Sequence, residues 1–173
     1  MGEEAFQSNH SPEVRTLASQ TTQRHPRRAA LLALRAIGAL ALIAMGVLHL
    51  QQYYDAGYSA LPTIGTLFVL NFAGGVALGL ALLLPVERLP GRAGAIAVPL
   101  LALTGAAMAA TSIVFLLVSE QTPLFGFLET STSSAITYAL LSESIATAAL
   151  GVLGVLSATR VKRTRAPALR TAA

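Results

Sequence analysis

The chain contains no cysteine and no tryptophan, and it carries little charge for its 173 residues. Without cysteine it has no disulfides, thiolate metal sites, cysteine nucleophiles, c-type haem attachments or cysteine-linked lipids. Charged residues make up 12% of the sequence, whereas hydrophobic residues make up 54%. Average soluble domains carry about 25% charged residues, because a solvated surface needs them. The composition therefore favours a membrane protein.

Four long apolar runs hold almost no charge: residues 29–50, 64–84, 93–118 and 136–156. The first contains only Arg35 and the fourth only Glu143. About 20 apolar residues in a helix cross the hydrocarbon core of a bilayer. We predict an all-α, polytopic membrane protein, a four-transmembrane up-down-up-down helix bundle. Four runs in one short chain argue against buried helices of a soluble protein, and the 28 residues before the first run argue against a signal peptide.

The positive charges predict the orientation. All 12 Lys and Arg residues lie in residues 15–35, in the break between the second and third runs, or in residues 160–170. The breaks at 51–63 and 119–134 contain none. The positive-inside rule therefore places both termini and the break between the second and third runs in the cytoplasm, with Arg35 reaching back to the inner interface. The location that we predict is the cytoplasmic (cell) membrane.

The two ends of the chain are polar and lack apolar periodicity. We expect residues 1–28 to be a disordered cytoplasmic tail and residues 157–173 to be a basic cytoplasmic tail. Orientation and attraction to anionic lipids account for the basic charge, and no nucleic-acid motif is present, so no nucleic-acid partner is predicted. Within the runs, small residues such as Gly75 and Gly79 allow close helix packing.

Polar residues inside the apolar runs are the strongest functional signal, because an unpaired polar group in hydrocarbon is costly. Asn71, Ser112 and Glu143 each lie roughly 10 Å from the outer end of their run at about 1.5 Å per residue, and His49 lies near the outer end of the first. Tyr58 and Glu129 belong to the breaks above this layer. We therefore predict an outer-leaflet polar vestibule, with ligand-binding candidates His49, Tyr58, Asn71, Glu129 and Glu143.

Each candidate also has a structural interpretation. Asn71 is suited to bonding a neighbouring helix, His49 and the tyrosines to the membrane interface, and Ser112 to its own helix carbonyl. Glu143 is the hardest to explain this way, because His49 is the only basic residue on the outer side that is available to pair with it. We expect these two side chains to face each other, or to share a proton through Asn71 or water.

Neither a metal nor a cofactor is indicated by a motif. An oxygen-rich site from His49, Asp55, Glu129 and Glu143 is chemically conceivable, but their spacing matches no metal motif, so no metal is predicted. The cofactor stays unassigned.

The segment from His49 to Asn71 carries a resemblance to a known group. It contains His49-Leu50, Gly57-Tyr58, Pro62-Thr63-Ile64-Gly65-Thr66-Leu67-Phe68 and Leu70-Asn71. This resembles the pattern HL…GY…IPxIGxLFxLN of small four-helix integral membrane proteins of high-GC Gram-positive bacteria, with Leu61 in place of the isoleucine. The stretch 125–129 and Glu143 are similar to the second half of that group. The resemblance covers about residues 35–156, implies no established activity, and is DoxX-like only in helix number and size.

Three classes of function follow from these observations. The first is a binding protein whose vestibule takes a small ligand, a lipid or quinone headgroup, or a partner subunit. The second is a small transporter or channel-like protein, although no polar path reaches the inner half. The third is an outer-leaflet membrane enzyme with His49 and Glu143 as an acid-base pair, although no catalytic motif is present. The lipid bilayer is the expected partner, with another membrane subunit or a homo-oligomer as further possibilities, and pure scaffolding is the remaining interpretation.

Overall fold

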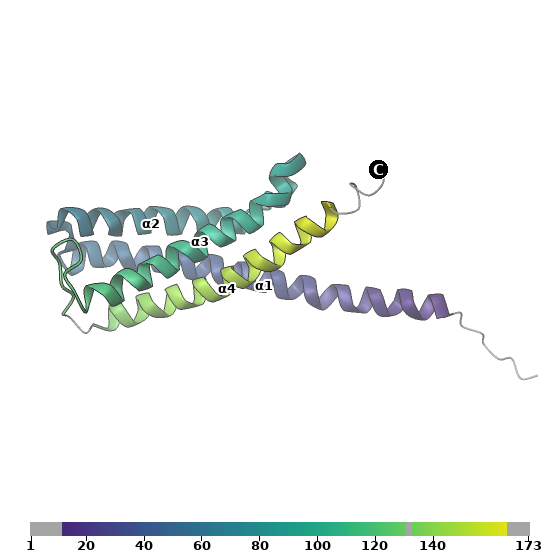
Figure 1. Ribbon diagram of the computed structural model, residues 1–173, viewed down its shortest axis with the longest axis horizontal. Coiled ribbons are helices and arrows are strands. Elements are labelled where there is room, and N and C mark those ends of the chain that lie inside the picture. The colour runs from purple at the N-terminus through teal and green to yellow at the C-terminus, as the bar shows by residue number, and fades with distance from the viewer. Residues whose placement is uncertain (1–11, 131–132, 166–173) are drawn as a thin grey trace, which may run out of the picture. The chain divides into compact units, whose positions relative to one another are not determined.

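The computed structural model describes residues 12–130 and 133–165. Four long helices account for most of them: α1 (Pro12–Asp55), α2 (Pro62–Leu83), α3 (Gly91–Ser119) and α4 (Ser134–Arg165), as Figure 1 shows. Two short 3-10 helices, η1 (Tyr58–Ala60) and η2 (Val86–Arg88), lie in the connections before α2 and α3. No strand occurs in this part of the chain, which confirms the all-α prediction for it.

Each of the four helices contains a stretch that is long and apolar enough to cross a membrane. These stretches are Arg27–Asp55, Pro62–Leu83, Gly91–Ser119 and Ser134–Val161. They enclose or closely overlap the four predicted runs, so the prediction of four such helices is confirmed. The fold is that expected of a multi-pass membrane protein.

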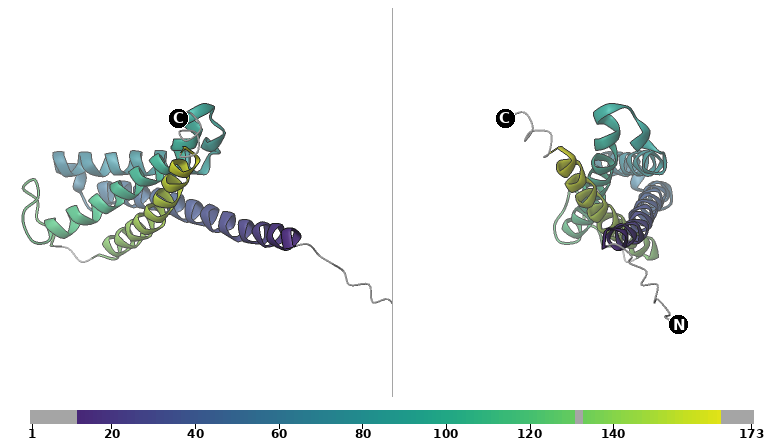
Figure 2. Two further views of the ribbon diagram at one scale, coloured as in Figure 1. Left: turned by 45° about the vertical axis from the view of Figure 1, so that its right-hand side comes forward. Right: turned by 90° about the vertical axis from the view of Figure 1, so that its right-hand side faces the viewer.

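The chain divides into two units between Ala33 and Leu34, within α1. In the first unit, residues 12–33 form helix by themselves. In the second unit, the remainder of α1 lies alongside α2, α3 and α4 (Figure 1), and Figure 2 shows these elements from two further directions.

Helix is present in part of each of the two predicted tails. Residues 12–28 are helical, and α4 continues through residues 157–165. Residues 1–11 and 166–173 lie outside the described part of the chain. The absence of apolar periodicity does not prevent helix formation next to an existing helix, because the apolar helix already supplies the costly nucleus.

Glycines bring α1 and α2 into direct backbone contact. A methyl group added at Gly75 would lie 2.7 Å from the carbonyl oxygen of Leu42, and one at Gly79 would lie 2.8 Å from that of Ala39. On the α1 side, a methyl group at Gly46 would lie 3.0 Å from the carbonyl oxygen of Phe72. The predicted Gly75/Gly79 pair therefore packs against α1, and neither glycine leaves room for a side chain.

The other helix pairs meet through side chains. Gly38 of α1 and Gly105 of α3 both pack against Leu150 of α4. Gly74 of α2 packs against the Met108 sulfur of α3, and Gly154 of α4 packs against Leu103 of α3. The largest fully buried side chains among the described residues are Leu42, Met45, Leu82, Leu150, Leu153 and, unusually, Glu143.

Arg35 joins α1 to the end of α2. Its Nε donates to the carbonyl oxygen of Leu82, its Nη2 donates to that of Leu84, and its Nη1 lies 2.9 Å from Oε2 of Glu87. The last carbonyls of a helix lack partners within the helix and carry partial negative charge, so a guanidinium is a favourable cap there. Rather than only reaching toward the interface, Arg35 satisfies the carboxyl end of α2.

Candidate functional site

A cavity of about 350 Å³ opens among the four helices and the segment that follows α3. Its lining includes all five candidates predicted from the sequence: His49, Tyr58, Asn71, Glu129 and Glu143. Most of the remaining lining is apolar, from residues such as Leu48, Ile64, Leu67 and Met108. Its volume and its mixture of an apolar wall with a few convergent polar groups are typical of small-molecule sites.

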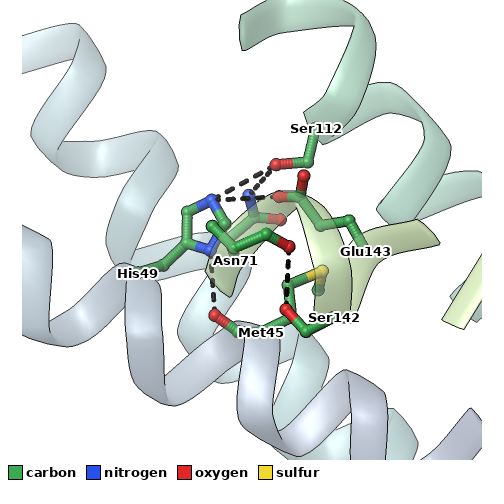
Figure 3. A network of polar contacts seen from close by, with 7 residues as sticks. Met45, His49, Asn71, Ser112, Ser142 and Glu143 are labelled. Carbon is green, nitrogen blue, oxygen red and sulfur yellow. Dashed lines mark hydrogen bonds and ion pairs between the residues drawn. The ribbon is translucent and has the colours of Figure 1, made fainter. Parts of the chain in front are cut away.

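His49 is held by its own helix. Its Nδ1 lies 2.9 Å from the carbonyl oxygen of Met45, one turn earlier in α1 (Figure 3). A carbonyl only accepts, so Nδ1 must carry a hydrogen. In the neutral imidazole, Nε2 is therefore an acceptor, and it is the atom that faces the polar cluster of α2, α3 and α4.

Ser112 bridges α2 and α1. Nδ2 of Asn71 donates to the Ser112 hydroxyl over 3.2 Å, and that hydroxyl lies 3.2 Å from Nε2 of His49. With the imidazole neutral, Ser112 donates to Nε2, and all donors point one way: Asn71 to Ser112, Ser112 to His49, His49 to Met45. The interpretation of Ser112 as bonded only to its own helix is not what the structure has.

Glu143 closes the cluster from α4, and its side chain is only 2% exposed. Its Oε1 lies 3.7 Å from Nε2 of His49 (Figure 3). Nε2 of His49 therefore faces both the Ser112 hydroxyl and the Glu143 carboxyl group. The expectation that His49 and Glu143 face each other therefore agrees with the geometry.

Tyr58 and Glu129 form a second pair in the cavity. The Tyr58 hydroxyl donates to Oε2 of Glu129, and both residues are buried. Glu129 is positioned by its backbone N–H, which donates to the carbonyl oxygen of Ser119 at the end of α3 over 2.8 Å. This pair links η1, which lies between α1 and α2, to the segment between α3 and α4.

A tight hairpin carries Phe127 to the cavity. The backbones of Leu124 and Phe127 exchange two hydrogen bonds of 2.8 and 3.0 Å. The two residues between them have positive φ angles, 52° at Phe125 and 80° at Gly126. Glycine adopts such angles freely, whereas a bulky residue rarely does, so Phe125 is a strained position.

Aromatic rings connect the two polar pairs. The ring centroid of Tyr58 lies 5.5 Å from that of Phe127 and 4.5 Å from that of Phe68, and Phe68 lies 4.9 Å from the imidazole of His49. We call this series Phe127, Tyr58, Phe68 and His49 the ring row. Sequence reasoning did not select Phe68 or Phe127, because single aromatic residues in apolar segments look like ordinary packing or belt residues.

The remaining acidic residues near this end of the bundle stay outside the cavity. Asp55 and Glu120 are exposed and do not line it. Among the described residues, no group of three or more His, Asp or Glu side chains is placed to hold a metal ion.

A scan against protein-family models and searches of curated proteins and of solved structures found no match to this chain. Functional inference therefore depends on the cavity itself.

Proposed function

We propose that the chain is a multi-pass protein of the bacterial cytoplasmic membrane that binds a small amphipathic ligand in this cavity. One observation carries the proposal: residues from all four helices and the hairpin segment converge on one cavity, and five polar residues selected from sequence alone line it. A bundle that needed these groups only for packing would have no reason to leave about 350 Å³ open beside them.

We propose an up-down-up-down arrangement with both termini in the cytoplasm. Support comes from contacts that run in opposite directions along α1 and α2 and along α3 and α4. Along α1 and α2, Leu42 contacts Gly75, and the earlier residue Ala39 contacts the later residue Gly79. Along α3 and α4, Leu103 contacts Gly154, and the later residue Gly105 contacts the earlier residue Leu150. The cavity then lies in the outer half of the membrane, because Arg35 and Arg88 mark the opposite end.

Single cysteines test the orientation, because the natural chain has none to interfere. Thr122→Cys lies in the connection between α3 and α4, and Glu87→Cys lies in η2 between α2 and α3; both positions are exposed. A membrane-impermeant maleimide applied to intact cells should label the first variant and spare the second. The reverse pattern would overturn the orientation.

Ligand binding is tested by what stays with the protein during purification. Wild type, Glu143→Gln and the exposed control Glu120→Gln are extracted in mild detergent, and bound small molecules are identified by mass spectrometry. We expect a species that accompanies wild type and Glu120→Gln and is depleted from Glu143→Gln. If all three proteins carried the same amount of bound small molecule and were equally stable, the polar cluster around Glu143 would have only a packing role.

A second candidate is an enzyme, and one observation favours it. The Ser112 hydroxyl, a potential nucleophile, lies 3.2 Å from an imidazole nitrogen that is able to accept its proton, inside a cavity. A fluorophosphonate that labels wild type and not Ser112→Ala would support this chemistry. If the fluorophosphonate did not label the protein, ligand binding would be the better supported of the two functions.

A further inference from the structure

The charges in the cavity have one sign. Among the residues that line it, Glu129 and Glu143 are acidic and none is lysine or arginine. His49 is the only lining side chain that is able to become cationic, and its lone proton-accepting nitrogen faces Glu143. A phosphate or carboxylate ligand would enter without the guanidinium or ammonium donors that such anions require in an apolar site.

Aromatic faces add to this preference. Tyr58, Phe68 and Phe127 line the cavity and are consecutive members of the ring row, and Phe115 lines it as well. The face of an aromatic ring is electron-rich and attracts an organic cation, most strongly where water is excluded. Two members of the ring row thus have a carboxyl group beside them, Tyr58 with Glu129 and His49 with Glu143.

The apolar lining sets the size and character of the rest of the ligand. Leu48, Ile64, Leu67, Met108 and Leu116 contribute hydrocarbon surface. A small inorganic cation would leave this surface wet and would lack a set of oxygen ligands, since no metal-binding group occurs among the described residues. An organic cation with an apolar body would cover it.

We infer that the ligand is a hydrophobic organic cation, an ammonium group on an apolar body, held by Glu143, Glu129 and the aromatic faces of the ring row. This inference rests on the proposed ligand-binding function and names the chemical class of its ligand. The ammonium belongs either to a free amine or to a long-chain amphiphile, and the experiment separates these sources.

Cation binding displaces a proton. We expect the His49–Glu143 pair to hold one proton when the cavity holds no cation, and an ammonium beside the Glu143 carboxylate then replaces that positive charge. The proton leaves for solvent, so charge balances. The other titratable groups facing the cavity are Glu129 and Tyr58, which are bonded to each other; Asn71 and Ser112 do not titrate.

The test compares a cation with its uncharged twin. Purified full-length protein in a nonionic maltoside is titrated calorimetrically with benzyltrimethylammonium and with neopentylbenzene, which replaces the nitrogen by carbon at nearly the same shape. We expect the cation to bind at least about tenfold more tightly. Equal binding of the two would overturn the inference without touching the proposed function, since the cavity would still bind an apolar ligand.

Variants then locate the charge. Glu143→Gln should weaken binding of the cation about tenfold or more and leave neopentylbenzene unchanged, whereas Glu120→Gln should change neither. Phe68→Leu, which keeps an apolar wall, should weaken the cation selectively. Because the cation and its twin are compared on wild type first, a variant that fails to fold does not remove the test.

Two further measurements complete the test of cation binding. Titrations in buffers of different ionisation enthalpy should report release of about one proton per bound cation, and no release would overturn the displacement step. Octyltrimethylammonium binding more tightly than benzyltrimethylammonium would indicate a long-chain source, and the reverse would indicate a free aromatic amine. If no probe binds and nothing accompanies the purified protein, both this inference and the proposed function are wrong.

Discussion

Oε1 of Glu143 lies 3.7 Å from Nε2 of His49, and the two side chains are 2% and 9% exposed. Nothing within either helix requires this pairing, since His49 is the only His, Asp, Glu, Lys or Arg in the outer half of the first apolar run, and Glu143 is the only one in the outer half of the fourth. The pair is a tertiary contact between α1 and α4 in a layer that also receives Asn71 from α2 and Ser112 from α3. Four helices thus meet at one buried polar layer.

Removing His49 should cost more stability than neutralising Glu143. His49→Leu leaves a buried carboxyl without its imidazole and is expected to lower the unfolding free energy by about 3 kcal/mol. Glu143→Gln keeps hydrogen-bonding capacity and should cost about 1 kcal/mol. Unfolding in mixed dodecyl sulfate and maltoside micelles measures both, and the double variant should show a coupling of about 1 kcal/mol or more. Strictly additive losses of unfolding free energy would mean that the contact between His49 and Glu143 does not contribute to stability.

Arg35 should matter more for its bonds to α2 than for its ion pair. Arg35→Met removes the cap on the carbonyls of Leu82 and Leu84 and is expected to cost about 2 kcal/mol of stability. Glu87→Gln removes only a half-exposed partner and should cost less than about 1 kcal/mol. The same unfolding assay compares the two, and equal losses would contradict the capping role.

Acid should weaken the contact between Arg35 and Glu87. The backbone N–H of Glu87, followed by the side chain of Arg35, lowers the pKa of the Glu87 carboxyl below its ordinary value of 4.5. A lowered pKa in the folded state means that the contribution is complete above pH 4.5 and is lost as the pH falls through the folded-state value. Unfolding measured from pH 6 down to pH 3 should show a small decline in wild type that Glu87→Gln lacks. Identical profiles would argue against the linkage.

Gly75 and Gly151 offer a matched pair of substitutions. Gly75→Ala places a methyl group 2.7 Å from the Leu42 carbonyl, which belongs to backbone and is unable to yield, so α1 and α2 must separate. We expect a loss of about 2 kcal/mol. At Gly151 an added methyl group meets nothing within 4 Å, so Gly151→Ala should be neutral or stabilising by up to about 1 kcal/mol. Similar effects at both positions would mean that the α1–α2 contact is looser than described.

The strain at Phe125 is separable from its packing. Phe125→Ala and Phe125→Gly both remove the ring that lies 6.3 Å from Phe115, but only glycine adopts a φ of 52° without cost. The glycine variant should therefore be more stable than the alanine variant by about 1 kcal/mol. Thermal unfolding in detergent measures the difference, and a more stable alanine variant would contradict the left-handed conformation.

Charge distribution made the helices predictable from the sequence. Runs without charge are long enough to span a bilayer, and the structure contains a helix at each of them. Helix ends were less predictable, because α1 and α4 extend into polar segments where periodicity is absent. Depth along a helix also follows from residue counting, which is why His49, Asn71 and Glu143 were selected together.

Rotation of a helix about its axis does not follow from depth. That Ser112 faces His49, and that Phe68 links Tyr58 to the imidazole, depends on which face of each helix packs inward. Contacts such as Gly74 against Met108 and Gly38 against Leu150 determine those faces, and an alanine-rich sequence offers many equivalent small-residue faces. The pairing of Tyr58 with Glu129 depends in addition on the hairpin, whose positive φ at Phe125 contradicts local preference.

The backbone contact between α1 and α2 also predicts where the bundle deforms. Main-chain atoms meeting at Gly46, Gly75 and Gly79 have no rotamers to exchange, so this seam stays fixed when the cavity contents change. The α2–α3 seam instead meets through Met108, an unbranched and adaptable side chain that also lines the cavity. We therefore expect a ligand that changes the shape of the cavity to move α3 relative to α2 more than α2 relative to α1.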